Sequence, residues 1–513
     1  MDITNLFTDI RKFVRKMQIR IAKAMQQNKF NKVRKLYRIL TSSTYAKILS
    51  VWRVINNKGG KTPGVDGVVW KKDEDLFVLA NTLKRKGYKP KPLRRLYIPK
   101  RNGKKRPLGI PTMKDRAMQA LHLLALEPVA ECTGDPNSYG FRQHRSCRDA
   151  LKQIFSCLSQ KLGATWIYEA DIKGCFDNIS HEWLLKHIPM DKQILRKWLK
   201  SGYIEQMKFY PTKSGTPQGG IISPTLMNLT MDGLEKLICK RFPKWRLGHK
   251  ANFIRYADDF VITAASRKII EDEIAPLVEH FLKERGLCLS PEKTKITHVN
   301  DGFDFLSQNN RKHSKGIFIQ KPAKKAVVEI KHKLRELVFK NLSAPPKILV
   351  QNLNSVLRGW TNYHKHVISK EIFKAIDFYL WKLLGKWCKR RHASKPWKWI
   401  RRKYFSASQE LCTFSSIELT KKGNKLKVHK LFRAGKVPII RHIKIKSSAN
   451  PFVREDKEYY SERRKILKEK SGKTKQACIL LKDFNAVDKT LLNLWNVEPA
   501  ESNKKPLRNA RAV

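Results

Sequence analysis

Three aspartates carry the clearest chemical signal in this sequence. Asp258 and Asp259 are neighbours in FIRYADDFVIT, and Asp171 follows the apolar segment TWIYEA. If such acids cluster, their like charges repel, so the cluster is stable only when it is protonated or binds cations. Ligand sets made only of oxygen atoms favour Mg²⁺, and two Mg²⁺ ions bound by acids promote phosphoryl transfer. The three acids therefore predict a magnesium site, with ordinary turn residues as the alternative.

The elements around the acids explain how they could meet. TWIYEAD is typical of a strand that ends at Asp171, and FIRYADDFVIT is typical of two short strands joined by a turn. A strand end and a neighbouring hairpin turn can bring three carboxylates together. Residues 1–45 have a basic, helical pattern, and three amphipathic helical patterns follow residue 322. We expect these last three to pack as helices with basic outer faces.

The charge of the chain indicates its class of partner. Among 513 residues, 107 Lys and Arg oppose 44 Asp and Glu, a formal net charge of +63 that is spread along most of the chain. Such an excess implies a polyanion, and nucleic acid is the expected partner. A membrane surface is the alternative, but no stretch approaches the roughly 18 consecutive apolar residues of a spanning helix, so we expect no membrane. The nine cysteines occur singly, which indicates reduced thiols in an intracellular protein, without a zinc site or disulfides.

Several motifs resemble those of a known enzyme family. EADIKGCFDNISH (169–181), GTPQGGIISPTLMN (215–228) and IRYADDF (254–260) are similar to the successive palm motifs of reverse transcriptases. TPGVDG, SYGFR and LSPEKTKI resemble further blocks of the group II intron reverse transcriptases. LNSVLRGWTNYH (353–364) and KWCKRRHASKPWKWIRRKYF (386–405) resemble the thumb, or maturase domain, of the same intron-encoded proteins.

This resemblance implies an α+β fold: a right-hand polymerase with fingers and palm, followed by an α-helical thumb and a basic DNA- and RNA-binding segment. We expect five parts, namely a basic helical extension at 1–48, fingers and palm at 49–322, the helical thumb or maturase domain X at 323–405, a basic nucleic-acid-binding segment at 406–470, and a divergent tail at 471–513. Many relatives end in a His- and Cys-rich nuclease domain. The tail contains one Cys and no His, so we expect no nuclease there.

The resemblance also implies RNA-directed DNA synthesis by a group II intron-encoded protein. Such proteins act as maturases, which bind intron RNA to promote splicing, and they support intron mobility. The implied partners are group II intron RNA, target DNA and dNTPs, in a ribonucleoprotein of the bacterial cytoplasm, with an organellar matrix or stroma as the alternative compartment. Two rival functions are a maturase with a decayed polymerase and a reverse transcriptase of another system, such as phage defence or diversity generation. The segment 353–405 argues against the second rival.

The resemblance assigns roles to residues near the acids. Asp171 and Asp258 are implied ligands of two Mg²⁺ ions, Asp259 completes the catalytic set, and the carbonyl of Ile172 is a further metal contact. Phe176 occupies the position of the steric gate that excludes the 2′-hydroxyl of a ribonucleotide. A phenylalanine of the core is the alternative for Phe176.

Other residues are implied in nucleotide and RNA binding. Gln218 should lie against the incoming nucleotide, with a plain glycine-rich turn as the alternative. Lys100, Arg106 and Arg94 match finger residues that grip the triphosphate, where cations offset phosphate charge; solvated charge in a basic loop is the alternative. The segment 386–405 is expected to contact RNA, since aromatic rings stack on bases while cations hold phosphates. Its candidate residues are Arg390, Arg391, Lys398, Arg401 and Arg402.

One segment departs from the family pattern. The family has F-L-G-F where this chain has FLSQ, with Ser307 and Gln308 in place of Gly and Phe. That segment is expected to hold the primer end, and a misplacement of about 1 Å can cost on the order of 10²-fold in rate. Because the three acids are intact, we predict an active polymerase.

Overall fold

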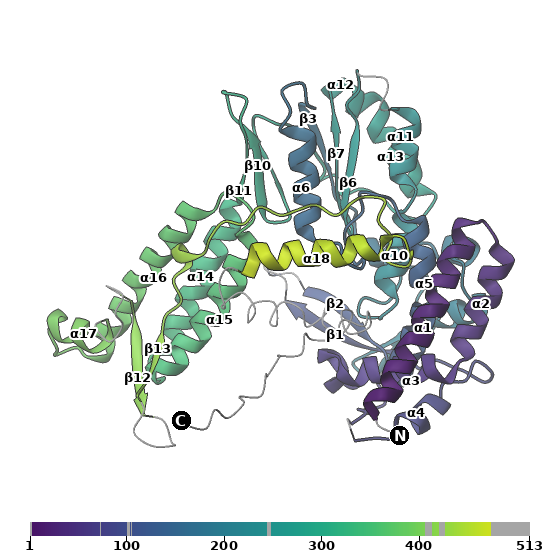
Figure 1. Ribbon diagram of the computed structural model, residues 1–513, viewed down its shortest axis with the longest axis horizontal. Coiled ribbons are helices and arrows are strands. Elements are labelled where there is room, and N and C mark those ends of the chain that lie inside the picture. The colour runs from purple at the N-terminus through teal and green to yellow at the C-terminus, as the bar shows by residue number, and fades with distance from the viewer. Residues whose placement is uncertain are drawn as a thin grey trace, which may run out of the picture.

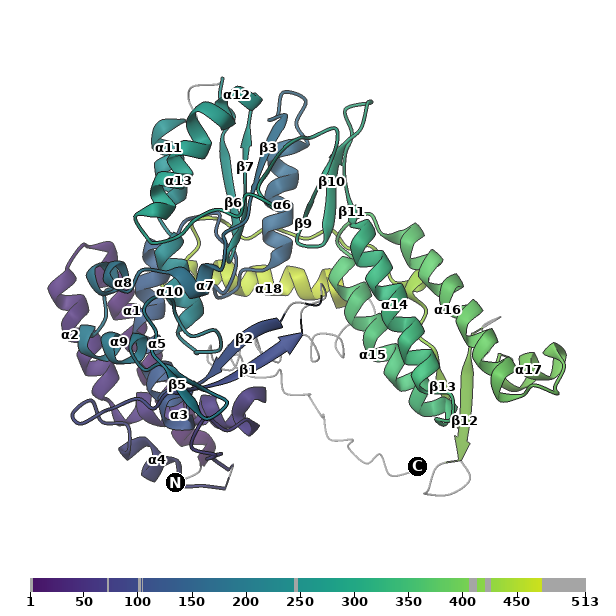
Figure 2. The ribbon, with the colours of Figure 1, turned by 180° about the vertical axis from the view of Figure 1, so that it is seen from behind.

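The computed structural model describes residues 3–71, 73–99, 103, 105–243, 248–405, 413–419 and 426–472. Figures 1 and 2 show an N-terminal group of helices, a central region of sheets, and a second group of helices on the opposite side. A final segment runs back from the second group across the centre. This mixture of helices and sheets, with a helical C-terminal region, confirms the predicted fold class.

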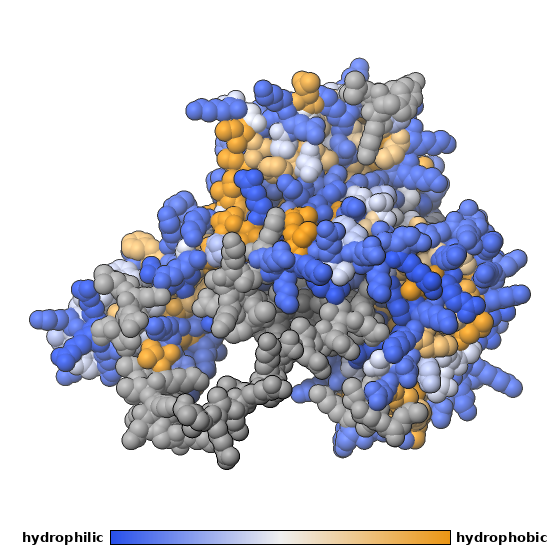
Figure 3. All heavy atoms as spheres, viewed as in Figure 1, coloured by the Kyte–Doolittle hydropathy of each residue, from blue (hydrophilic) through white to orange (hydrophobic). Residues whose placement is uncertain are grey.

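The N-terminal group is a bundle whose apolar faces turn inward. It contains α1 (Ile3–Gln26), α2 (Phe30–Ser42), α3 (Thr44–Asn56), α4 (Leu76–Asn81) and α5 (Met113–Thr133). In α1 the buried residues Ile10, Val14, Met17 and Ile21 recur at helical spacing, so one face packs inward, where α5 contacts α1, α2 and α3. Figure 3 shows mostly hydrophilic residues over the outer side of α1 and α2. The helices predicted for residues 1–45 are therefore confirmed.

A four-stranded sheet with the order β2-β1-β4-β5 lies next to this bundle. Its strands are β1 (Leu93–Pro99), β2 (Lys105–Ile110), β4 (Tyr203–Glu205) and β5 (Lys208–Tyr210). β1 and β2 form an antiparallel hairpin in which Arg94 pairs with Ile110 and Ile98 pairs with Arg106. Because side chains alternate along a strand, Arg94 and Arg106 share one face of this hairpin and Arg95 lies on the other.

The central sheet has the order β6-β7-β3-β8 and is antiparallel throughout. Its strands are β3 (Trp166–Ala170), β6 (Asn252–Tyr256), β7 (Asp259–Ala264) and β8 (Lys295–His298). Ile254 and Val261 pack on one face with α6 (Cys147–Leu158), whereas Phe260 and Ile262 pack on the other with α11 (Leu234–Arg241) and α13 (Ala275–Lys283). Burial on both faces holds the strand ends of this sheet in place.

Short elements connect the sheets and lead to the second helical group. The helices are α7 (Cys175–Asn178), α8 (His181–His187), α9 (Lys192–Leu199), α10 (Ser223–Met231) and α12 (Arg267–Ile269), and a π-helical turn (Ile270–Ile274) joins α12 to α13. A three-stranded sheet then follows, made of β9 (Phe303–Phe305), β10 (Gln308–Lys312) and β11 (Phe318–Pro322). This sheet lies between the central sheet and the second helical group (Figure 2).

The second helical group confirms the three helices predicted after residue 322. It consists of α14 (Lys324–Lys340), α15 (Pro346–His364), α16 (Lys370–Arg391) and the shorter α17 (Trp397–Tyr404). Leu334, Leu353, Leu380 and Trp387 are fully buried between these helices. The apolar stripes seen in the sequence are thus the faces along which the helices pack.

The return segment, which we define as residues 431–472, runs back over the centre of the molecule (Figure 1). It follows a hairpin of β12 (Ser415–Leu419) and β13 (Leu426–Lys430) beside α15, and it ends in α18 (Asp456–Gly472). Asp149, at the start of α6, accepts hydrogen bonds from the amide of Ile445 (2.8 Å), from His442 Nε2 (2.9 Å) and from Arg463 Nη2 (3.1 Å). One buried carboxylate therefore fastens three points of the return segment to the central region.

The predicted division into five parts stays a prediction. The sequence predicted a basic nucleic-acid-binding segment at 406–470, and its described residues from 431 onward pack on the rest of the chain. Nucleic-acid contacts of that segment stay a prediction too. Of the predicted tail, residues 473–513 lie outside the described residues.

Candidate active site

The three aspartates lie at one edge of the central sheet. Asp171 is the first residue after β3, Asp258 lies in the turn between β6 and β7, and Asp259 begins β7. Ala170 of β3 pairs with Phe260 of β7, so the next residues toward this edge are Asp171 and Asp259. The apolar residues of the strands fix this register, because a shift of one residue would expose the buried face. The structure thus brings together the three acids that the sequence assigned to one site.

One lysine and mutual repulsion set the charge balance of this edge. Lys293 Nζ donates a 2.8 Å hydrogen bond to Asp171 Oδ2, and this bond raises the pKa of Lys293. The pKa of Asp259 is raised to about 6, first because surrounding protein atoms reduce its hydration and then because Asp258 and Asp171 repel its negative charge. Asp259 still reaches solvent, so a cation has access to it. Added positive charge favours the ionised form of Asp259.

The acids fit a divalent metal in their chemistry, although they do not form a closed cage. In the part of the chain that the structure describes, no three His, Cys, Asp or Glu side chains are grouped closely enough to hold a metal ion. Accessible carboxylates nevertheless suit Mg²⁺, which keeps several waters and binds through one or two carboxylates together with substrate phosphates. Ile172 forms a bridge with Leu289 through hydrogen bonds of the flanking residues, and none of these bonds uses the carbonyl of Ile172.

The motif SYGFR (138–142) supports the turn that carries Asp258. It lies beside β6, where the buried guanidinium of Arg255 donates to Asn228 Oδ1 at 3.1 Å. Asn228 Nδ2 in turn donates to the carbonyl of Gly140 at 2.9 Å. Gly140 packs so closely that a Cβ atom added to it would lie 2.2 Å from the amide nitrogen of Ala257. The position of the turn therefore depends on a glycine in the neighbouring motif.

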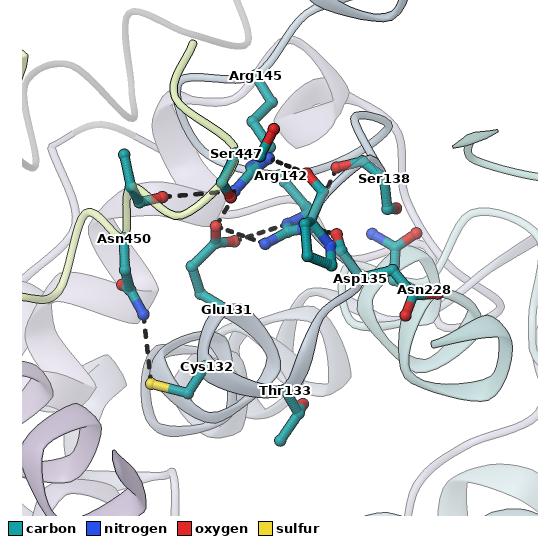
Figure 4. A network of polar contacts seen from close by, with 12 residues as sticks. Glu131, Cys132, Thr133, Asp135, Ser138, Arg142, Arg145, Asn228, Ser447 and Asn450 are labelled. Atoms are coloured by element: carbon teal, nitrogen blue, oxygen red, sulfur yellow. Dashed lines mark hydrogen bonds and ion pairs between the residues drawn. The ribbon is translucent and has the colours of Figure 1, made fainter. Parts of the chain in front are cut away.

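Figure 4 shows how the return segment reaches the same motif. Arg142, the last residue of SYGFR, pairs with Glu131 of α5 at 2.7 Å, and Arg145 approaches the same carboxylate at 3.4 Å. Arg145 Nη2 also donates to the carbonyl of Ser447 in the return segment at 3.1 Å. These buried contacts form a continuous path from the return segment to the Asp258 turn.

Two of the predicted nucleotide-binding residues line one cavity of about 280 Å³ beside the β1–β2 hairpin. Phe176 is half-buried, and its carbonyl accepts a hydrogen bond from the amide of Thr216 at 2.7 Å. The backbone carbonyl of Gln218 accepts a hydrogen bond from the amide of Gly109 at 2.7 Å. The side-chain Nε2 of Gln218 donates to Asp177 Oδ2 at 3.1 Å. These contacts hold the predicted gate and the predicted nucleotide contact close to each other.

Two of the predicted triphosphate-binding cations, Arg94 and Arg106, are not among the described residues that line this cavity. Lys100 lies outside the described residues. Arg94 and Arg106 are on the face of the hairpin opposite to Arg95, which does line the cavity and whose guanidinium lies 3.8 Å from the ring centre of Tyr203. A nucleotide held by Arg94 and Arg106 therefore has to approach the other face of the hairpin.

The predicted RNA-binding cations are exposed at the outer end of the second helical group (Figure 2). Arg390 and Arg391 end α16, and Arg391 lies over the ring of Trp387 at 5.1 Å. The other three lie on α17, namely Lys398, Arg401 and Arg402. Cations supported by aromatic rings on an outer surface are available to a nucleic acid.

Three known domain families match successive parts of the chain. The N-terminal domain of reverse transcriptase matches residues 6–83, reverse transcriptase (RNA-dependent DNA polymerase) matches 98–310, and the maturase-specific domain of group II introns matches 327–405. Protein YkfC of Escherichia coli is 32% identical over 336 residues, which cover 57% of this chain and 87% of YkfC. The group II intron-encoded protein LtrA of Lactococcus lactis subsp. cremoris is 29% identical over 494 residues, covering 81% of this chain and 80% of LtrA. The chain belongs to the group II intron reverse transcriptases.

As a member of this family, the protein is an RNA-directed DNA polymerase with a maturase domain, which confirms the predicted function. The family is generally metal-dependent, and its members imply binding of intron RNA. A solved structure of telomerase from Candida albicans is 13% identical, with a TM-score of 0.35 over 61% of this chain and 64% of that chain. Within the described residues, no helix is both long and apolar enough to cross a membrane.

The sequence alone did not reveal several residues that support the acids. Lys293 lies in the block LSPEKTKI, but as one of 107 Lys and Arg its charge alone did not mark it as the partner of Asp171. Gly140 could be recognised only once its neighbour Ala257 was known. Arg255 did offer a signal, since a charged residue inside an apolar strand is costly to bury unless it is paired.

Proposed function

We propose that Asp171, Asp258 and Asp259 hold two Mg²⁺ ions at the primer terminus, with the carbonyl of Ile172 as a further ligand, for DNA synthesis on an RNA template. The observation that carries this proposal is the β3–β7 register, which sets Asp171 beside Asp259. When bound, the ions supply positive charge that activates the 3′-hydroxyl of the primer and stabilises the leaving pyrophosphate. The chain contributes a rigid edge, because strands buried on both faces hold the acids.

The residues beside the acids select and orient the nucleotide in this proposal. Phe176 lies under the sugar and excludes a 2′-hydroxyl, while Gln218 contacts the nucleotide from the neighbouring turn. Their shared cavity supports the pairing of these two roles. Lys100, together with Arg94 and Arg106 of the hairpin, binds the triphosphate and offsets its charge, which requires the triphosphate to extend from the cavity to the opposite face of the hairpin.

The proposed partners are group II intron RNA, target DNA and dNTPs. The exposed cations of 386–405, together with the net charge of +63, favour long contacts with a phosphate backbone. Splicing chemistry then belongs to the intron RNA, and the protein assists by binding it. We place the ribonucleoprotein in the bacterial cytoplasm, with an organellar matrix or stroma as the alternative.

The test is the double variant Asp258→Ala/Asp259→Ala, assayed three ways in one preparation. Extension of oligo-dT on poly-rA should fall to background, because ligands for both ions are lost. Intron RNA affinity and maturase-assisted splicing should persist, since they depend on other surfaces. Glu271→Ala/Asp272→Ala is the matched control, because it removes the same charge from an exposed pair elsewhere in the chain.

Three results would contradict the proposal. Parental extension by the double variant would show that the acids are turn residues. A joint loss of folding, RNA affinity and extension would show that they are structural. A parent that promotes splicing but extends no primer would favour the maturase with a decayed polymerase.

A further inference from the structure

The turn between β9 and β10 has a backbone that its residues rarely adopt. Leu306 and Ser307, its two central residues, have φ angles of +48° and +60°. This left-handed region is costly for side chains other than glycine. Two-residue hairpin turns of this kind normally contain Asn-Gly, Asp-Gly or Gly-Gly. Contacts from outside the hairpin can offset this cost.

One contact comes from the second helical group and one from the residue that follows β11. Tyr363 Oη, on α15, donates to the carbonyl of Leu306 at 2.8 Å. The amide of Ala323, just before α14, donates to the carbonyl of Ser307 at 3.1 Å. Both carbonyls of the turn thus accept hydrogen bonds from outside the β9–β10 hairpin. A strained turn persists when its surroundings fix it in this way.

Gln308 adds a third contact, and it points away from the surface. The sequence placed it at the primer end, but its side chain is fully buried. Its Nε2 lies 2.8 Å from Nδ1 of His364, the last residue of α15. The amide of Gln308 and the imidazole of His364 thus share one hydrogen bond. Burial lowers the pKa of His364 to about 4, which favours a neutral ring.

The turn and the strand that leads to Asp258 pack against the same apolar cluster. Leu306 and Tyr256 pack at the margin of one apolar cluster, and Tyr256 precedes Asp258 by two positions in the sequence. Burial, followed by the neighbouring Cys147 and Tyr256, raises the pKa of Tyr363. The residue that holds the β9–β10 turn is therefore also a neighbour of the strand that leads to the acids.

We propose that Gln308, His364 and Tyr363 form a lock that fixes the β9–β10 turn to α15 and so sets the position of the primer end relative to the thumb. This inference rests on the proposed function, since it assumes synthesis at the three acids. Gln308 is a positioning residue: it is buried and acts through His364. Where the family has Phe, this chain has Gln308, which gives the turn a polar attachment to the thumb while the polymerase is retained.

The experiment uses the full chain and two conservative variants. Tyr363→Phe removes only the hydroxyl that bonds the turn, and Gln308→Met removes the amide at nearly constant volume. Each should raise the KM for primer about three- to tenfold, the factor expected for one hydrogen bond, and should shorten the products on a long RNA template. The KM for dNTP should stay at the parental value, because the nucleotide contacts lie at a different part of the chain.

Asn309→Ala is the matched control. Asn309 is the next residue on β10, and its amide bonds Asp304 of the same hairpin at 2.8 Å, so its loss should leave primer KM and product length unchanged. Parental primer KM and product length in Tyr363→Phe would overturn the lock, even if Gln308→Met proved unstable. An equal rise of primer and dNTP KM would also overturn it, as a general loss of structure. If the parent protein extends no primer, the proposed function itself is contradicted.

Discussion

Replacing Gly140 by Ala tests whether the position of the Asp258 turn controls catalysis. The added methyl carbon would lie 2.2 Å from the amide nitrogen of Ala257, 2.9 Å from its Cα and 3.0 Å from its Cβ. Since non-bonded atoms prefer about 3.5 Å, the two segments must separate by about 1 Å. Because Asn228 holds the carbonyl of Gly140 through a 2.9 Å hydrogen bond, part of the displacement should pass to the Asp258 turn.

The size of the effect follows from that displacement. A shift of about 1 Å in catalytic groups costs on the order of 10²-fold in rate, which corresponds to about 2.7 kcal/mol of activation free energy. Overpacking also lowers the free energy of unfolding by about 1–3 kcal/mol. We therefore expect Gly140→Ala to fold, to bind intron RNA with parental affinity, and to extend a primer about 100-fold more slowly. Single-nucleotide extension at saturating dNTP measures this directly.

Gly359→Ala is the control for a simple glycine-to-alanine change. Gly359 lies within α15, and a Cβ atom there would meet no atom within 4 Å, so the change should raise stability by up to about 1 kcal/mol and leave extension unaffected. Parental extension and a parental melting temperature in Gly140→Ala would refute the reasoning. A loss of RNA affinity equal to the loss of extension would refute it as well, because the damage would then not be confined to the turn.

Other predictions follow from separate parts of the structure. Phe176→Val should allow extension with rNTPs alone, whereas continued rejection of rNTPs would make Phe176 a packing residue. Neutralising the five exposed cations at 389–391 and 401–402 should weaken RNA binding and flatten its salt dependence; an unchanged slope would remove them from the RNA contact. Burial alone would raise the pKa of Asp149, but the hydrogen bond from His442 and the charge of Arg463 lower it. The ionised carboxylate of Asp149 therefore contributes stability above about pH 3.9, and this contribution is lost below that pH. Asp149→Asn should lower the free energy of unfolding by about 1–3 kcal/mol at pH 6 and by less at pH 3.5. An equal loss at both pH values in thermal denaturation would contradict this prediction.

Local patterns were sufficient to predict the elements that carry the acids. TWIYEAD and FIRYADDFVIT contain apolar, β-branched and aromatic residues on both sides of their acids, and they form strands of one sheet. The apolar spacing after residue 322 predicted helices, because their packing faces are continuous in the sequence. What these patterns could not supply was the order of strands in each sheet, since pairing depends on contacts far along the chain.

The return segment shows the same limit for charged residues. The nucleic-acid-binding segment predicted at 406–470 stays a prediction, and within it Arg463 and His442 are directed to Asp149, while Lys444 donates to Gln153 of α6. A lysine or arginine looks the same in a sequence whether it meets a phosphate or a buried carboxylate. Only the position of Asp149 at the start of α6 distinguishes the two.

Gln308 shows why one departure from a family pattern cannot be judged alone. Along β10 the inward residues Gln308 and Asn310 are as polar as their neighbours, so alternation gives no signal for the buried face. Burial of Gln308 is tolerated because its partner, His364, is also polar. That partner lies 56 residues away in the sequence, so no local pattern indicates it. Replacing Gln308 by the Phe of the family would leave the buried imidazole without that partner, at a cost of about 1–3 kcal/mol. Gln308→Phe, which restores the residue of the family, should therefore lower the stability of this protein, because Gln308 and His364 depend on each other.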